Sequence, residues 1–166
     1  MSTSALLAPT RSLPVFEPGA WEVTPLPART CRLRVFTMRD YEQVIALWLK
    51  TGITVGPTDS REGILHTLQY NPDLFLIADN GQRVVGTVIG TYDGRCGWAH
   101  HVAVDPQWQG AGVGVALMRE LENRLRARGC ATINLTVKRT NAQVQGFYER
   151  LGFDPRDVIC MQKSLD

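Results

Sequence analysis

The chain has 166 residues, a length typical of a single domain with one hydrophobic core. Its hydrophobic content of 44% and charged content of 20% are those of an ordinary globular protein. A net charge of +2 gives no support for binding to nucleic acid or another polyanion. No apolar run approaches a membrane span, and the amino-terminal residues lack the pattern of a secretory signal. We therefore expect a cytoplasmic protein with no nucleic-acid or membrane partner.

Residues 1–30 differ from the rest of the chain. They hold five of the nine prolines and show neither helical nor strand periodicity, which predicts an extended proline-rich arm. We expect the folded domain to occupy residues 31–166. Its four cysteines form no C-x-x-C pair and lie at no metal-ligand spacing from the three histidines, so reduced thiols and no metal site are expected.

The first half of the domain predicts a strand, two helices and a meander of three strands. Residues 32–36 alternate as a strand, and a helix begins at the capping-box-like Thr37-x-x-Asp40 and continues up to Gly52. Ser60 is placed to cap a second helix that ends before Asn71. Strands are expected at 74–78, 83–91 and 98–104, and Asn80-Gly81 indicates a tight hairpin between the first two.

The second half begins with a long amphipathic helix. Residues 112–128 place an apolar residue at every fourth position, and Gly129 ends the pattern. A strand at 131–137 is expected to lie parallel to the strand before the helix, because a helical crossover joins them. A short helix at 141–151 and a final strand at 158–162 complete the predicted elements.

A glycine-rich loop joins the strand at 98–104 to the long helix. It reads Gln109-Gly-Ala-Gly-Val-Gly114. Free N–H groups at a helix start favour an anion, and glycine lets the backbone approach it closely. The spacing lacks the Lys-Ser or Lys-Thr of a P-loop, and Val115 stands where a dinucleotide fingerprint needs its third glycine. On the glycines alone, a tight strand-to-helix turn explains the loop equally well.

Two motifs together resemble the GNAT acetyltransferase superfamily. The first is Q-x-x-G-x-G directly after V-A-V-D-P, and the second is N-A-Q-V-Q-G-F-Y-E-R-L-G-F over residues 141–153. The resemblance covers residues 32–164, and the run 86–94 is most similar to a subgroup of small bacterial GNAT proteins. It implies a mixed α/β fold: a mostly antiparallel sheet of about six or seven strands, splayed between the two central strands, with about four helices.

The resemblance also implies acetyl-CoA as cosubstrate and assigns residues to it. The loop N–H groups would bind the pyrophosphate, the preceding strand would pair with the pantetheine arm, and a backbone N–H near Val102 would face the thioester oxygen. Tyr148 matches the family's general acid for the departing thiolate, although its spacing also fits a core aromatic. Asn141 matches an asparagine that contacts CoA, or a helix cap. The implied cofactor-binding residues are Val102, Ala103, Val104, Gln109, Gly110, Ala111, Gly112, Val113, Gly114, Asn141 and Tyr148.

The general base does not follow the family pattern. Many members carry a glutamate on the strand before the loop, but residues 96–101 contain no carboxylate. Strict alternation places Trp98, His100 and Val102 on one face, so His100 is the favoured base over His101 unless a bulge exchanges them. A water chain, with both histidines purely structural, is the alternative.

The function implied is N-acetyl transfer from acetyl-CoA to a primary amine of a small molecule or protein, by direct attack in a ternary complex. A non-catalytic acyl-CoA-binding or sensing protein with the same fold is the alternative, favoured by the missing glutamate and opposed by Tyr148. A nucleotide- or phosphate-binding regulator is a third option, which the loop spacing opposes. Family members often dimerise, so a homodimer stays open.

Overall fold

The structure, a computed structural model, describes residues 30–163. The predicted arm over residues 1–30 lies outside this range except for its last residue. A single sheet has the strand order β1-β2-β3-β4-β5, antiparallel except for the parallel pair of β4 and β5. The strands are Arg32–Val35 (β1), Phe75–Asp79 (β2), Val84–Tyr92 (β3), Gly97–Val104 (β4) and Ile133–Asn134 (β5).

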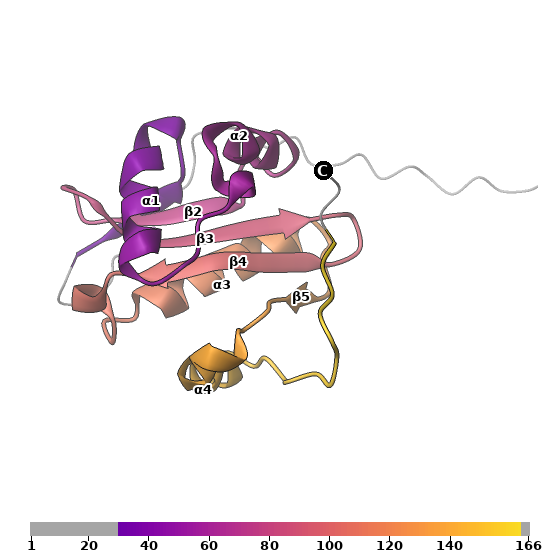
Figure 1. Ribbon diagram of the computed structural model, residues 1–166. Coiled ribbons are helices and arrows are strands. Elements are labelled where there is room, and N and C mark those ends of the chain that lie inside the picture. The colour runs from indigo at the N-terminus through magenta and orange to yellow at the C-terminus, as the bar shows by residue number, and fades with distance from the viewer. Residues whose placement is uncertain (1–29, 164–166) are drawn as a thin grey trace, which may run out of the picture.

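Helices cover both faces of this sheet (Figure 1). The α-helices are Tyr41–Lys50 (α1), Arg61–Tyr70 (α2), Val113–Ala127 (α3) and Gln145–Arg150 (α4), and the 3-10 turns are Met38–Asp40 (η1), Pro57–Asp59 (η2), Pro106–Trp108 (η3) and Arg139–Val144 (η4). Helices α1 and α2 lie on one face and α3 on the other, while α4 lies beyond β5. None of the helices within residues 30–163 is long and apolar enough to cross a membrane.

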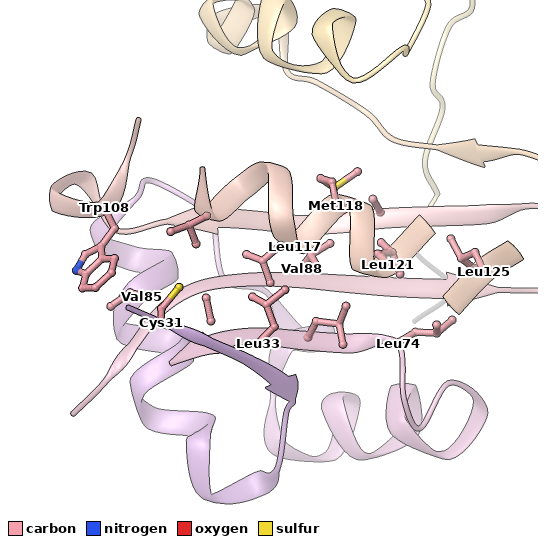
Figure 2. Packing of buried hydrophobic residues seen from close by; sticks show 14 of the residues in the cluster. Cys31, Leu33, Leu74, Val85, Val88, Trp108, Leu117, Met118, Leu121 and Leu125 are labelled. Atoms are coloured by element: carbon pink, nitrogen blue, oxygen red, sulfur yellow. The ribbon is translucent and has the colours of Figure 1, made fainter. Parts of the chain in front are cut away.

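The core has two layers that follow from the pattern of apolar residues. The predicted stripe of α3, which comprises Val113, Leu117, Leu121 and Leu125, is buried against the sheet, at most 2% exposed (Figure 2). A second cluster, centred on Trp48 of α1, fills the opposite face. Full burial of a side chain of this size stabilises the fold by about 1.5–3 kcal/mol, so these two layers fix the sheet between its helices.

Local capping and turn chemistry place the element boundaries. The Ser60 hydroxyl accepts a hydrogen bond from Gly63 N at 3.1 Å, which confirms it as the cap of α2. The Asn80 side chain accepts hydrogen bonds from two backbone N–H groups, Gln82 N at 3.0 Å and Arg83 N at 2.9 Å, and Gly81 has a φ of 88°. These contacts confirm the hairpin turn between β2 and β3.

The carboxyl-terminal half has less strand than its pattern predicts. The strand expected at 131–137 is reduced to Ile133–Asn134, and residues 158–162 form no strand. The side chains of Val158, Ile159 and Met161 are 76%, 88% and 88% exposed. The reason is lack of a partner: β5 pairs with only Gly97 and Trp98 of β4. The described sheet therefore has five strands rather than six or seven, with four α-helices as expected.

Candidate active site

Strand β4 carries a bulge at its centre. His100 pairs with Ile89 and Ala103 pairs with Thr87, so two residues of β4 oppose a single residue of β3. One of the two is His101, whose φ of 48° makes it the one non-glycine residue in the described chain with a positive φ. An extra residue of this kind stays out of the ladder and re-aims the side chains around it.

The bulge places both histidines on the same face of the sheet. The His101 ring packs against Trp48 of α1 with centroids 4.4 Å apart, and His100 lies opposite Ile89 of the same core layer. Val102 packs with the other layer, beneath α3. The expected alternation, with His100 and Val102 together and His101 opposite, is therefore wrong, because the extra residue shifts the phase of the strand.

A buried hydrogen-bond chain holds the bulge. The indole Nε1 of Trp48 donates to Thr87 Oγ1 at 2.9 Å, and the Thr87 hydroxyl donates to the carbonyl oxygen of His101 at 2.9 Å. Trp48 and Thr87 are fully buried. A non-glycine residue in the left-handed region costs roughly 1–2 kcal/mol, and such strain persists only where neighbouring structure fixes it.

His101 also faces a buried carboxylate. Its Nε2 lies 3.1 Å from Asp59 Oδ1, although the N–H direction is not aligned well enough for a hydrogen bond, and Nε2 is buried without one among residues 30–163. Asp59 is 4% exposed and its Oδ2 accepts a hydrogen bond from Gly56 N at 2.8 Å. Asp59 was not predicted as a site residue, because an acidic side chain just before a helix cap such as Ser60 is common.

His100 has a different environment. Its ring stacks near Trp98, with centroids 6.2 Å apart, and its Nε2 lies 3.3 Å from Thr91 Oγ1. Partial desolvation, with a smaller repulsion from His101, lowers the pKa of His100, although much of the residue remains exposed. This histidine is therefore neutral and reachable at pH 7, and no carboxylate pairs with it within the described residues.

The glycine-rich loop presents the start of α3. Gly110 and Gly112 have φ values of 74° and 82°, which an L side chain rarely adopts, and Gly112 is the residue that precedes the helix. The first N–H groups of a helix have no acceptor inside it. The conformation therefore directs a set of backbone donors and the positive end of the helix dipole to one point.

A buried carboxylate anchors this loop to the sheet. Asp105, at the end of β4, pairs with Lys50 of α1 at 2.9 Å and with Arg83 at 3.2 Å, and its Oδ1 caps Gln107 N at 3.0 Å. Burial alone would raise the pKa of Asp105, but the hydrogen bond from Lys50, that from Gln107 N and the nearby cations outweigh it and hold the pKa below its usual range. The loop therefore leaves the sheet from a fixed point.

Strand β4 loses its partner on the side of β5 just before the bulge. The two strands pair only at Gly97 with Ile133 and at Trp98 with Asn134, so they separate over the second half of β4. The backbone of residues 102–104 borders this opening. The side chain of Gln109 folds back and donates from Nε2 to the Val104 carbonyl at 3.1 Å.

Tyr148 lies on α4, next to the residue that packs on the start of α3. Its half-buried ring lies edge-on to Phe147 and Phe153, with centroids 5.0 and 5.8 Å away, and burial raises the pKa of the phenol above its ordinary value. Phe147 packs on the start of α3: a Cβ on Gly114 would lie 3.2 Å from Phe147 Cζ. Gly114 thus permits α4 to approach the loop, and the two sequence motifs meet there.

Asn141 lies in η4 and not in α4. The predicted single helix over 141–151 is two short pieces, because Asn141 has a non-helical φ of −114° and ψ of 33°. Its exposed side chain accepts a hydrogen bond from Gln143 Nε2 at 3.5 Å and does not cap α4, which begins at Gln145. No group of three metal-binding side chains occurs within residues 30–163.

Comparison with solved structures places this geometry in a known fold. Ard1 from Thermoplasma volcanium matches with 27% identity and a TM-score of 0.66, over 75% of this chain and 82% of that one. The PaiA N-acetyltransferase from Thermoplasma acidophilum, solved with coenzyme A, matches with 22% identity and a TM-score of 0.70, over 78% and 93%. Glucosamine-6-phosphate N-acetyltransferase from Arabidopsis thaliana matches with 19% identity and a TM-score of 0.63, over 82% and 99%.

Sequence comparison agrees. The model of the Acetyltransferase (GNAT) family matches residues 34–153, which include both motifs, the bulged strand and most of the described domain. The five-strand, mostly antiparallel open sheet with four helices is consistent with the fold of that family. The chain belongs to the GNAT acetyltransferase family.

Proposed function

We propose that the protein is an N-acetyltransferase that moves the acetyl group of acetyl-CoA to a primary amine of a small molecule or a protein. The amine nitrogen forms a bond to the acetyl carbon as the carbon–sulfur bond breaks, the nitrogen loses a proton and the thiolate gains one. The observation that carries this proposal is the meeting of three features: the glycine-rich loop at the start of α3, the open edge of β4 and the helix that bears Tyr148.

The residues present fit acetyl-CoA. The backbone N–H groups of residues 109–114 suit a pyrophosphate, which binds where glycine brings the backbone close to a helix start. The backbone of residues 102–104, open where β5 separates from β4, suits an extended pantetheine arm. The Thermoplasma acidophilum relative of this fold was solved with coenzyme A, which supports the same ligand here.

Tyr148 suits the role of the acid. A phenol whose pKa is raised by burial stays protonated at neutral pH and can donate to a thiolate, whose conjugate thiol has a reference pKa of about 8.5. The acceptor amine would enter from the α1 and α2 face, where both histidines of β4 point. The nitrogen of a neutral amine must lose one proton as it becomes the amide, so a histidine on this face suits the role of the base.

The first experiment is calorimetric titration with acetyl-CoA, with ATP and NAD as comparison ligands. We expect binding of acetyl-CoA alone. Gly112→Asp should weaken it at least about tenfold, equivalent to ~1.4 kcal/mol, because the variant strains the backbone and places a negative charge at the anion site. Gly129→Asp is the matched control, since Gly129 has a φ of 79° at the opposite end of α3.

Two outcomes separate the candidate functions. Release of free CoA thiol in the presence of an amine panel, together with the loss on Gly112→Asp, supports the enzyme. Binding of acetyl-CoA without thiol release from any amine would favour an acyl-CoA-binding protein, and no binding at all would remove both. Equal affinity of the Gly112→Asp and Gly129→Asp variants would show that the loop is not the pyrophosphate site.

A further inference from the structure

The bulged strand and the α1–α2 connection bring a histidine and an aspartate together, although they lie far apart in the sequence. We propose that His101, positioned by Asp59, is the base that removes the proton from the acceptor amine, and that His100 is not. The proposal rests on the proposed acetyl transfer and assigns one of its two proton transfers. It depends on the 3.1 Å approach of His101 Nε2 to Asp59 Oδ1, on the burial of that nitrogen and on the burial of Asp59.

The Asp59 carboxylate is held in place by its own neighbours. Its Oδ2 accepts from Gly56 N at 2.8 Å and its backbone carbonyl accepts from the hydroxyl of Tyr41 at 3.0 Å. Its Oδ1 is left to face the imidazole. Because Asp59 is 4% exposed, water does not compete strongly for that oxygen, and the imidazole is the partner that relieves the burial of its charge.

The two ring nitrogens of His101 then have separate roles. A carboxylate accepts and cannot donate, so its negative charge beside Nε2 favours the neutral tautomer with the proton on Nε2, which leaves the lone pair of Nδ1 free. Nδ1 makes no hydrogen bond with the described residues and is not among the buried unpaired atoms, while 24% of the side chain is exposed. The exposed edge of the ring is therefore the basic one.

The surroundings of His101 contain few other titratable groups. Helix α1 contributes the indole of Trp48 and, through Asp59, the hydroxyl of Tyr41, β3 contributes the neutral Thr87, and β4 contributes His100. Among residues 30–163, no carboxylate pairs with His100, and its Nε2 lies near the hydroxyl of a threonine, which both donates and accepts. Of the two histidines, only His101 is oriented by a charge.

The proton transfer balances with the rest of the reaction. As nitrogen bonds to the acetyl carbon, its proton passes to Nδ1 of His101, and the resulting imidazolium is stabilised by the Asp59 carboxylate. The carbon–sulfur electron pair leaves with the thiolate, which takes a proton from Tyr148. Asp59 touches neither substrate nor cofactor and acts through His101, so it is a positioning residue. After product release, solvent removes the extra proton from His101 and returns a proton to Tyr148.

Asp59→Asn tests the orientation of the His101 imidazole and needs no acceptor amine. The asparagine oxygen can keep the hydrogen bond from Gly56 N, but its NH₂ group then faces His101 Nε2, where a donor opposes a donor. Nitrogen-15 spectra of the imidazoles, assigned with His→Gln variants, should show the proton of neutral His101 on Nε2 in the wild type and on Nδ1 in Asp59→Asn. A wild-type His101 with its proton on Nδ1 would overturn the proposal.

Steady-state rates with the best amine of the panel test the chemistry. We expect His101→Gln and Asp59→Asn to lower kcat by roughly 10²–10⁴-fold, the range that general base catalysis contributes, with an unchanged Kd for acetyl-CoA. The acidic limb of the kcat–pH profile should disappear in His101→Gln and persist in His100→Gln. His66→Gln, an exposed histidine of α2, is the matched control and should leave the rate unchanged.

Failure of this assignment differs from failure of the function. If the wild type transfers acetyl groups and His101→Gln keeps its rate and pH profile, the dyad is overturned while the acetyltransferase stands. If His100→Gln alone loses the acidic limb, the base is His100. If no amine is acetylated although acetyl-CoA binds, the proposed function fails and the assignment falls with it.

Discussion

The hydrogen-bond chain beneath the bulge can be tested by replacing one buried hydroxyl. Thr87→Val keeps the shape of the side chain but removes the acceptor for Trp48 Nε1 and the donor for the His101 carbonyl. A buried polar group left without a partner costs about 1–3 kcal/mol, and the added methyl returns ~0.8 kcal/mol. With two groups unpaired, we expect a net loss of roughly 3 kcal/mol in the free energy of unfolding.

Urea denaturation and thermal melting measure this loss. For a domain of this size, 1 kcal/mol corresponds to about 3–4 °C, so the melting temperature should fall by roughly 9–12 °C. Thr87→Ser is the matched control: it keeps the hydroxyl, loses one methyl and should cost only ~1 kcal/mol. The indole N–H of Trp48 should also exchange with solvent faster in Thr87→Val. A valine variant as stable as the wild type, or more stable than the serine variant, would refute the reasoning.

Three further changes have defined outcomes. Gly90→Ala should lower the free energy of unfolding by about 1–3 kcal/mol in urea titrations, because its Cβ would overlap Leu121 Cδ1. The hydrogen bond from Arg34, against the opposing effect of burial, holds the pKa of Asp40 below its usual range. The wild type should therefore exceed Asp40→Asn in stability by a constant amount above about pH 5, and this margin should shrink as pH falls through the folded pKa. Tyr148→Phe should lower kcat by roughly 10²-fold and leave the Kd for acetyl-CoA nearly unchanged.

Each of these has a contradicting result. If Gly90→Ala had no stability cost, the sheet and α3 would have room to separate at that position. Gly146→Ala is the control, because its Cβ would meet only Arg150 Nη1, at 3.5 Å. If the stability difference between the wild type and Asp40→Asn grew as the pH fell, folding would raise the pKa of Asp40 rather than lower it. A Tyr148→Phe variant with full turnover would remove the phenol from the reaction.

Features that depend on neighbours in the sequence could be predicted from it. The apolar stripe of α3 repeats every fourth residue, and the cap at Ser60 and the turn at Asn80 each involve contacts within three residues. Both the glycine-rich loop and the second motif were recognisable because the backbone conformations they require restrict the residue types allowed. Periodicity and capping depend on residues close together in the chain, so both can be predicted from the sequence.

Features that depend on partners far along the chain could not be predicted. The bulge in β4 is held by Thr87 of β3 and Trp48 of α1. Nothing in the amino-acid sequence of β4 shows that the alternation of its side chains between the two faces breaks at His101. Asp59 becomes informative only when the fold places it 3.1 Å from that ring. The predicted strand at 131–137 likewise depends on a partner, and β4 diverges from it after two residues.

The same irregularity in β4 connects the two halves of the proposed reaction. A regular strand would point only one of two adjacent histidines toward α1 and α2, and its backbone would remain paired along its length. The bulge directs His101 to Asp59 on the acceptor side. Where β4 has also left β5, the backbone beyond the bulge borders the opening that suits the pantetheine arm. In the proposed reaction, the strained residue His101 would lie beside the thioester as the base. The buried Trp48–Thr87 contact holds the carbonyl of His101 and so fixes the bulge on which both arrangements depend.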